Sequence, residues 1–127
     1  MFPLRERRSV LIVEDDKATR TMFETALRAA GFRTISAGDG LQALQVLDVT
    51  RPSLIVLDLG LPGLSGRDVA REVLASPVTR PMPIVVVTGL DTEDLPASPH
   101  LLIIRKPVTP EEIVATVEGH VDPRRRR

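Results

Sequence analysis

The sequence predicts a doubly wound α/β domain, in which a parallel β-sheet is covered by helices on both faces. Five short apolar runs are nearly continuous, which is typical of strands buried on both faces. These runs alternate with segments of helical periodicity, and such alternation favours parallel strands joined by right-handed crossovers. A length of 127 residues, with 43% hydrophobic and 27% charged residues, fits one ordinary globular domain.

Each predicted strand is a short run, mostly of Val, Ile and Leu. These residues suit a pleated surface that is packed on both sides. In chain order the predicted strands are Val10–Val13, Thr34–Ala37, Leu54–Leu57, Ile84–Val87 and Leu101–Ile104.

Three connections between these strands, and the segment after the last one, carry helical signals. A polar residue precedes each as a candidate N-cap, and Thr109 is followed by Pro110 and Glu112, which predicts a capping box. The predicted helices are Lys17–Ala30, Gly40–Val49, Gly66–Ala75 and a last helix from Thr109 to Val121, and the other N-caps are Asp16, Asp39 and Ser65.

Apolar residues at helical spacing indicate which side of each helix faces the sheet. The first helix should end at Gly31, because glycine is the usual residue after a helix C-terminus. The predicted buried stripes are Met22, Ala26, Leu27 and Ala30 in the first helix, Leu41, Leu44 and Leu47 in the second, Val69 and Val73 in the third, and Ile113, Val117 and Val121 in the last.

The fourth connection, Gly89–His100, is predicted to be irregular. Pro96 and Pro99 lie inside it, and each removes a backbone donor and disfavours a continuing helix. At most a turn or two of helix fits, around Thr92–Leu95.

Composition excludes several classes of protein. The chain has no cysteine, so it forms no disulfides and has no thiolate metal site or cysteine nucleophile. No apolar run approaches the roughly 18 residues of a membrane span, and the start MFPLRERR lacks the apolar segment of a secretory signal. We therefore expect a cytoplasmic protein with no membrane partner.

Charge is distributed unevenly along the chain, although the formal net charge is zero. Residues 9–122 carry 10 Lys and Arg against 16 Asp and Glu, a balance of −6, whereas both ends are rich in arginine. We predict basic tails over residues 1–8 and 122–127 and one folded domain over residues 9–121. An acidic body repels phosphate backbones, so direct DNA binding by the domain itself is not expected.

Chemically reactive residues follow four of the predicted strands. In a doubly wound sheet the functional crevice lies beyond the carboxyl ends of the strands. Converging carboxylates repel one another and favour a cation, and an all-oxygen ligand set favours Mg²⁺. A carboxylate can also attack phosphorus, with a hydroxyl and an ammonium stabilising the transferring group. The residues in question are Glu14, Asp15, Asp58, Thr88 and Lys106.

Four motifs in order resemble those of the response-regulator receiver domains of two-component signalling, including the chemotaxis receiver. They are VLIVEDD, VLDLGLPGLSG, VVVTG and IIRKP, and the resemblance covers about residues 9–121. It implies a flavodoxin-like, five-stranded parallel sheet with strand order 2-1-3-4-5. In this chain the helix of the fourth crossover, helix 4 of that fold, should be short or irregular.

The resemblance also implies a function. Asp58 would be the phosphoacceptor, Thr88 would donate a hydrogen bond to the phosphoryl group, and Lys106 would pair with it. Mg²⁺ would be bound directly by Asp15 and Asp58, through water by Glu14, and by the backbone carbonyl of Gly60. The donor would be a sensor histidine kinase or a histidine phosphotransfer protein, and an unknown downstream protein would receive the signal. Such a domain is not a turnover enzyme, because it catalyses only its own phosphorylation and dephosphorylation.

At three positions this chain differs from the residues that are usual in receiver domains. Ile103 stands where the family usually has an aromatic residue that reorients with the switch hydroxyl. Gly60 and Leu90 stand two residues after Asp58 and Thr88, where polar side chains help to orient a hydrolytic water. We therefore expect slow self-dephosphorylation. The Lys106–Pro107 bond is expected to be cis, as in the family.

Two other functions are weighed against this one. A receiver-like interaction module that works without phosphorylation is favoured by the altered fourth crossover, and disfavoured by the intact set of acids, hydroxyl and lysine. A nucleotide- or flavin-binding α/β protein would need a Gly-rich first loop, but the first strand leads into Glu14 and Asp15 instead.

Overall fold

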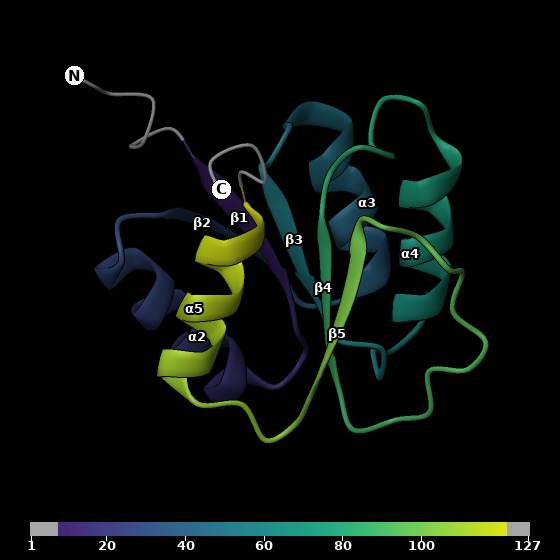
Figure 1. Cartoon of the computed structure of the whole chain (residues 1–127). Coiled ribbons are helices and arrows are strands. Elements are labelled where there is room, and N and C mark those ends of the chain that lie inside the picture. Colours follow the sequence, from purple (N-terminus) through teal and green to yellow (C-terminus); the bar gives the residue numbers. More distant parts are fainter. Residues whose placement is uncertain (1–7, 122–127) are drawn as a thin grey trace.

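The computed structural model describes residues 8–121 and shows a five-stranded parallel sheet in the order β2-β1-β3-β4-β5 (Figure 1). The predicted fold class and strand order are confirmed. Each strand lies within one residue of its prediction at either end. The strands are β1 (Ser9–Val13), β2 (Arg33–Ala37), β3 (Leu54–Leu57), β4 (Ile84–Thr88) and β5 (Leu101–Arg105).

Helices cover both faces of the sheet. One face packs against α2 (Lys17–Ala29) and α5 (Pro110–His120), and the other packs against α3 (Gly40–Val49) and α4 (Gly66–Ala75) (Figure 1). Successive residues of β1 alternate between the two cores: Val10 and Ile12 face α2 and α5, whereas Leu11 and Val13 face α3 and α4. The central strands are therefore buried on both sides, which explains their continuous apolar sequence.

The predicted helix starts are confirmed at the level of side chains. Asp16, Asp39, Ser65 and Thr109 each accept a hydrogen bond from the backbone N–H three residues ahead. The capping box of α5 is complete, because Glu112 in turn accepts from the backbone N–H of Thr109 at 2.8 Å. After α2 the chain turns at Gly31, whose φ of +99° is one that glycine adopts without strain.

Two of the predicted stripes need correction. In α3 the side chain of Leu41 is 59% exposed, and the buried positions are Ala43 and Leu47, four residues apart on the face toward the sheet. Leu41 lies two positions before Ala43, which rotates it away from that face. In α2 the buried residues are Leu27 and Phe23, which the predicted stripe lacks, whereas Ala30, which it includes, is exposed.

The fourth crossover contains no helix. Between β4 and β5 the backbone follows bends and turns. The N–H of Leu95 donates to the carbonyl of Thr92 at 3.1 Å, and a second turn is closed by the N–H of Leu101 on the carbonyl of Ser98 at 3.2 Å. In Figure 1 this connection is an extended loop beside α4. The prediction of an irregular segment is thus confirmed, and the helical turns allowed around Thr92–Leu95 are reduced to a single turn.

The predicted tails, residues 1–8 and 122–127, lie outside the described residues except for Arg8. Within residues 8–121, no helix combines the length and the apolar character needed to cross a membrane.

Candidate functional site: an acidic cluster at the carboxyl edge of the sheet

The candidate site lies where β1 and β3 end side by side. Val13 is paired with Leu57 in the parallel register, so the residues that follow, Glu14 and Asp58, leave the sheet at the same edge. Two main-chain bonds extend the ladder beyond the strands. Asp58 N–H donates to the carbonyl of Val13, and Glu14 N–H donates to the carbonyl of Ala37, both at 3.0 Å. The backbone of both acids is therefore as fixed as the sheet itself.

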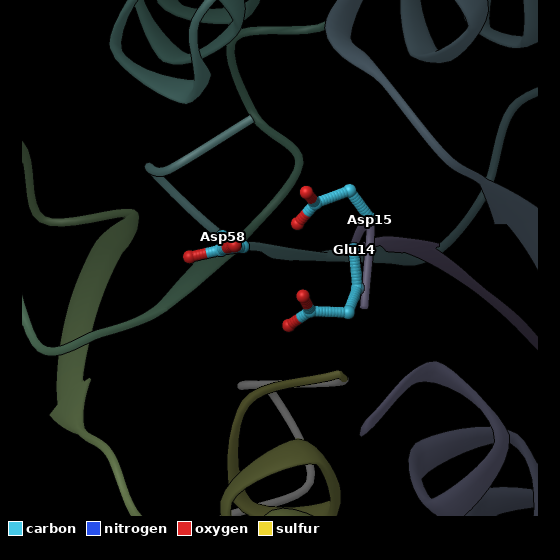
Figure 2. A group of neighbouring side chains, drawn as sticks. All are labelled: Glu14, Asp15 and Asp58. Carbon is cyan, nitrogen blue, oxygen red and sulfur yellow. The ribbon is translucent and has the colours of Figure 1, made fainter. Parts of the chain in front are cut away.

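Three carboxylates gather at this edge. Glu14, Asp15 and Asp58 each offer an oxygen, and these oxygens lie within 4.8 Å of one another. Figure 2 shows the side chains of Glu14 and Asp15 extending from the end of β1 on the side where Asp58 lies. Glu14 is 1% exposed and Asp58 8% exposed, whereas Asp15 is exposed. Two of the three acids are thus largely withdrawn from water, which makes their mutual repulsion costly.

The loop after Asp58 is shaped by close packing against the start of α4. A Cβ on Gly66 would lie 2.2 Å from the carbonyl oxygen of Asp58 and 2.6 Å from the Cα of Leu59. Real Cβ atoms do not approach backbone so closely, so glycine is required at this position. The start of α4 therefore packs directly against the backbone of Asp58 and Leu59.

Lys106 places its ammonium between two of the acids. Its Nζ lies 3.1 Å from Oε1 of Glu14 and 3.6 Å from Oδ1 of Asp58. The Lys106–Pro107 bond is cis, as expected, and the N–H of Lys106 donates to the carbonyl of Thr88 at 3.1 Å. Partial burial disfavours the charged amine, but the hydrogen bond that Lys106 donates to Glu14 and the charges of Glu14 and Asp58 outweigh it and raise the pKa of Lys106.

Glu14 has an unusual environment for a carboxylate. Burial raises its pKa above the ordinary 4.5, and the charge of Asp58 raises it further. The N–H of Asp16 and the ammonium of Lys106 act in the opposite direction without cancelling the rise. Both carboxylate oxygens already have partners: Oε1 faces Lys106, and Oε2 accepts from Asp16 N–H at 3.1 Å.

Thr88 and Gly60 complete the set of predicted site residues. Thr88 is fully buried at the end of β4, and its Oγ1 accepts the N–H of Leu90 at 2.9 Å. Its hydroxyl proton is not used in that bond, so it remains available to another acceptor. Gly60 N–H donates to Oδ1 of Asp58 at 3.2 Å, which folds the loop back over the carboxylate.

The donor set fits a divalent cation that prefers oxygen ligands. Three carboxylates face one ammonium, which leaves the cluster with a formal charge of −2. Among the described residues, no hydrogen bond occupies the carboxylate of Asp15, whereas both oxygens of Glu14 are engaged. This difference suits direct ligation by Asp15 and ligation through water by Glu14. Mg²⁺ is the cation best matched, because it takes a few carboxylates and keeps several waters.

Two arginines that sequence reasoning did not identify also contact this region. Arg20, one turn into α2, donates from Nη1 to the carbonyl of Glu14 at 2.8 Å and to that of Asp15 at 3.4 Å. Arg105, directly before Lys106, donates to the carbonyl of Leu90 and to the hydroxyl of Thr92. Spacing on α2 gives a weak signal for Arg20, because it lies four residues after the N-cap Asp16. Arg105 has no comparable signal.

Comparison with known proteins shows the family. Residues 10–118 match the model of the response regulator receiver domain. The DNA-binding response regulator MtrA of Mycobacterium tuberculosis is 40% identical over 119 residues, which cover 91% of this chain and 51% of that protein. The polar-differentiation response regulator DivK of Brucella anthropi is 30% identical over 118 residues, which cover 90% of this chain and 96% of that protein. The chain therefore spans about half the length of its MtrA relatives and nearly all of DivK.

Solved structures agree in fold. The receiver domain of a signal transduction histidine kinase from Syntrophus aciditrophicus superposes with a TM-score of 0.84 at 24% identity, over 94% of both chains. The receiver domain of a sensor histidine kinase from Pseudomonas aeruginosa PAO1 has a TM-score of 0.80 at 27% identity, over 91% of this chain and 98% of that one. That protein has a magnesium ion coordinated in its active site cleft. The chain belongs to the response regulator receiver domain family of two-component signalling.

Proposed function

We propose that this receiver domain accepts a phosphoryl group on Asp58 from the phosphohistidine of a sensor histidine kinase or a histidine phosphotransfer protein. The observation that carries the proposal is the position of the Lys106 ammonium, 3.1 Å from Glu14 and 3.6 Å from Asp58, within a cluster of three carboxylates. The phosphorylated domain then changes its interaction with a downstream protein.

The residues of the chain divide the chemistry of phosphoryl transfer between them. One oxygen of Asp58 attacks phosphorus, and the phosphorus–nitrogen bond of the donor breaks with its electron pair left on the imidazole. Lys106 stabilises negative charge on the transferring group, because its ammonium already faces Oδ1 of Asp58. Thr88 then donates its free hydroxyl proton to a phosphoryl oxygen, while its Oγ1 keeps the hydrogen bond from Leu90.

We propose Mg²⁺ as the cofactor of this step. Asp15, Asp58 and the carbonyl of Gly60 would hold it directly, and Glu14 would hold it through water. A bound divalent cation supplies charge that offsets the carboxylates and the incoming phosphate. The chain contributes the fixed positions of Glu14 and Asp58, which the main-chain bonds to Ala37 and Val13 determine.

Intact mass measurement tests the proposal. After incubation with acetyl phosphate and Mg²⁺, we expect an adduct of about 80 Da, the mass of one phosphoryl group. Asp58→Asn should abolish the adduct, and omission of Mg²⁺ should greatly slow its formation. Asp48→Asn, which changes an exposed acid on α3, is the matched control and should label like the parent.

A second candidate function is an interaction module that works without phosphorylation. The fourth crossover favours it, because the loop between β4 and β5 replaces a helix on one side of the domain. The same experiment separates the two. An unlabelled parent chain, under conditions that label another receiver domain, would favour the second candidate. Direct DNA binding by the domain is not part of either proposal.

A further inference from the structure

The loop between β4 and β5, which contains no helix, is held by side chains of its neighbours. Arg105, the last residue of β5, donates from Nη1 to the carbonyl of Leu90 and from Nη2 to the hydroxyl of Thr92, the latter at 3.0 Å. Arg105 reaches these groups because it pairs with Thr88 in the parallel register. The guanidinium therefore fixes the first residues of the loop immediately after the buried end of β4.

Leu90 connects this arginine to the candidate site. Its N–H donates to Oγ1 of Thr88, and its carbonyl accepts from Arg105, so both ends of its peptide backbone are held. Its side chain reaches toward the loop after Asp58. The point where a Cβ on Gly60 would stand is 3.7 Å from Cδ1 of Leu90 and 3.8 Å from Oδ2 of Asp58. The side chain of Leu90 and the carboxylate of Asp58 thus both border the space that a side chain at position 60 would enter.

We propose that Arg105 is a positioning residue for the lifetime of the phosphorylated state. By holding Leu90, it keeps an apolar side chain beside Asp58 and limits the approach of water to the acyl phosphate. The inference rests on the proposed function, because it concerns the loss of the group that Asp58 accepts. Leu90 is 47% exposed, so its place depends on the hydrogen bonds of its backbone more than on burial.

The reaction at issue is hydrolysis of the acyl phosphate. A water oxygen attacks phosphorus in line with the bond to Asp58, and that phosphorus–oxygen bond breaks with its electron pair left on the carboxylate. The water releases its proton to solvent, and the products are inorganic phosphate and free Asp58. A side chain beside Asp58 controls this reaction by access, because the attacking water must occupy a defined position.

The test measures decay of the adduct of about 80 Da after buffer exchange has removed the phosphodonor and free Mg²⁺ from the labelled protein. Arg105→Gln should shorten the lifetime roughly threefold to tenfold, the scale on which contacting residues are coupled. Arg105→Lys should give an intermediate rate, since one ammonium replaces a fork that reaches two acceptors. Arg33→Gln, at an exposed position of β2 on the opposite edge of the sheet, is the matched control and should decay like the parent.

A double-mutant cycle separates positioning from simple loss of charge. Leu90→Ala should also shorten the lifetime, because it removes the shielding side chain. If Arg105 acts through Leu90, Arg105→Gln should add little in the Leu90→Ala background. If it acts by charge alone, the same acceleration should appear in both backgrounds.

The outcomes distinguish this inference from the proposed function. An adduct that forms on the parent but decays at the same rate in Arg105→Gln would contradict the role of Arg105 and leave phosphorylation of Asp58 intact. If Arg105→Gln accelerated decay of the adduct equally in the parent and in the Leu90→Ala background, that result would contradict the role of Arg105 as well. Failure of the parent to form any adduct would contradict the proposed function itself, and this inference with it.

Discussion

The two halves of the site are held in place by different forces. On the side of β1 and β3, Glu14 and Asp58 are 1% and 8% exposed, and main-chain hydrogen bonds continue the sheet into them. On the side of β4 and β5, Thr88 is buried but the residues that follow it are exposed, and arginine side chains hold the loop that they form. The acids are part of the core, whereas the loop is attached to its surface.

Because of this difference, global stability and the local geometry of the loop depend on different residues. The positions of the acids are determined by packing, so a substitution that displaces their backbone costs stability of the whole domain. The loop after Thr88 is held by exposed polar contacts, which contribute little to global stability but determine local geometry. Substitutions in the loop should therefore alter rates or signalling while the fold persists.

The largest expected effect comes from a glycine on the side of the acids. Gly66→Ala would place a Cβ 2.2 Å from the carbonyl oxygen of Asp58, so backbone must shift. We expect a loss of about 2–3 kcal/mol in the free energy of unfolding, as for other overpacked sites. Urea denaturation followed by circular dichroism measures it.

The matched substitution on the other side is Gly89→Ala. A Cβ there would meet nothing within 4 Å, and Gly89 begins the loop after Thr88. We expect a change of less than about 0.5 kcal/mol, typical of open surface positions. Similar losses in the two variants would contradict the contrast between the halves.

A smaller effect is expected from relieving the repulsion between acids. Asp58→Asn keeps the shape of the side chain but removes one charge from the cluster, and it also removes the attraction of Lys106 at 3.6 Å. In EDTA we expect a net gain of about 1 kcal/mol, because the repulsions from Glu14 and Asp15 are both lost, against the loss of one attraction to Lys106. A melting temperature below that of the parent in EDTA would show that Lys106 already neutralises the cluster.

Mg²⁺ should reverse the order of these two proteins. A ligand that binds the native state at tenfold excess over its Kd adds about 1.4 kcal/mol. We expect this gain for the parent and little of it for Asp58→Asn, which has lost a ligand. Titration of the melting temperature with MgCl₂, and with KCl at equal ionic strength as the control, measures the difference.

The pH dependence of stability should report on Glu14. Its pKa is raised by burial, so above pH 4.5 the unfolded chain loses the proton while the native protein keeps it. The stability contributed by Glu14 is therefore complete below pH 4.5 and falls as pH rises through the raised pKa. Asp16 and Glu112 act differently, because hydrogen bonds at helix caps lower their pKa and their contributions are lost only at lower pH.

Glu14→Gln in EDTA should flatten the slope above pH 4.5. Glu118→Gln, at an exposed position of α5, should retain the slope of the parent. Denaturation midpoints measured from pH 4.5 to 8 give both slopes. An unchanged slope in Glu14→Gln would assign the pH dependence to another group.

Sequence patterns predicted the half of the site that the core determines. Glu14 and Asp58 follow continuous apolar runs directly, and the order of parallel strands brings those chain ends together. Lys106 was identified by its motif, and the structure places its ammonium at the acids. The proposed roles of these residues in phosphorylation stay predictions until the adduct is measured.

On the other side Thr88 and Lys106 were also predicted, but the contacts of the loop after Thr88 were not, because they depend on the path of a segment without periodicity. Nothing local to Arg105 shows that its guanidinium meets the carbonyl of Leu90, fifteen residues earlier. The exposed side chain of Leu41 shows a similar limit. Leucines spaced by three residues do not determine which face of a helix is buried, and Ala43 faces the sheet in place of Leu41.

The smallest expected effect on stability, and the sharpest test of the contrast, concerns the other arginine that holds the loop. Arg67 of α4 donates to the carbonyl of Asp91 and pairs with Asp94 at 2.9 Å, and its pairing lowers the pKa of Asp94. Arg67→Gln should lower the melting temperature by no more than about 2 °C, because Asp94 is exposed and the pair is screened by salt.

Hydrogen exchange should nevertheless show a local change in Arg67→Gln. Amides of residues 90–95 should exchange faster, because the loop opens without unfolding of the sheet, while amides of β1 and β3 should exchange as in the parent. Arg80→Gln, an exposed arginine just before β4, provides the control. Faster exchange spread over the strands would mean that the loop and the core open together, and that the acids and the loop do not form two independently held halves.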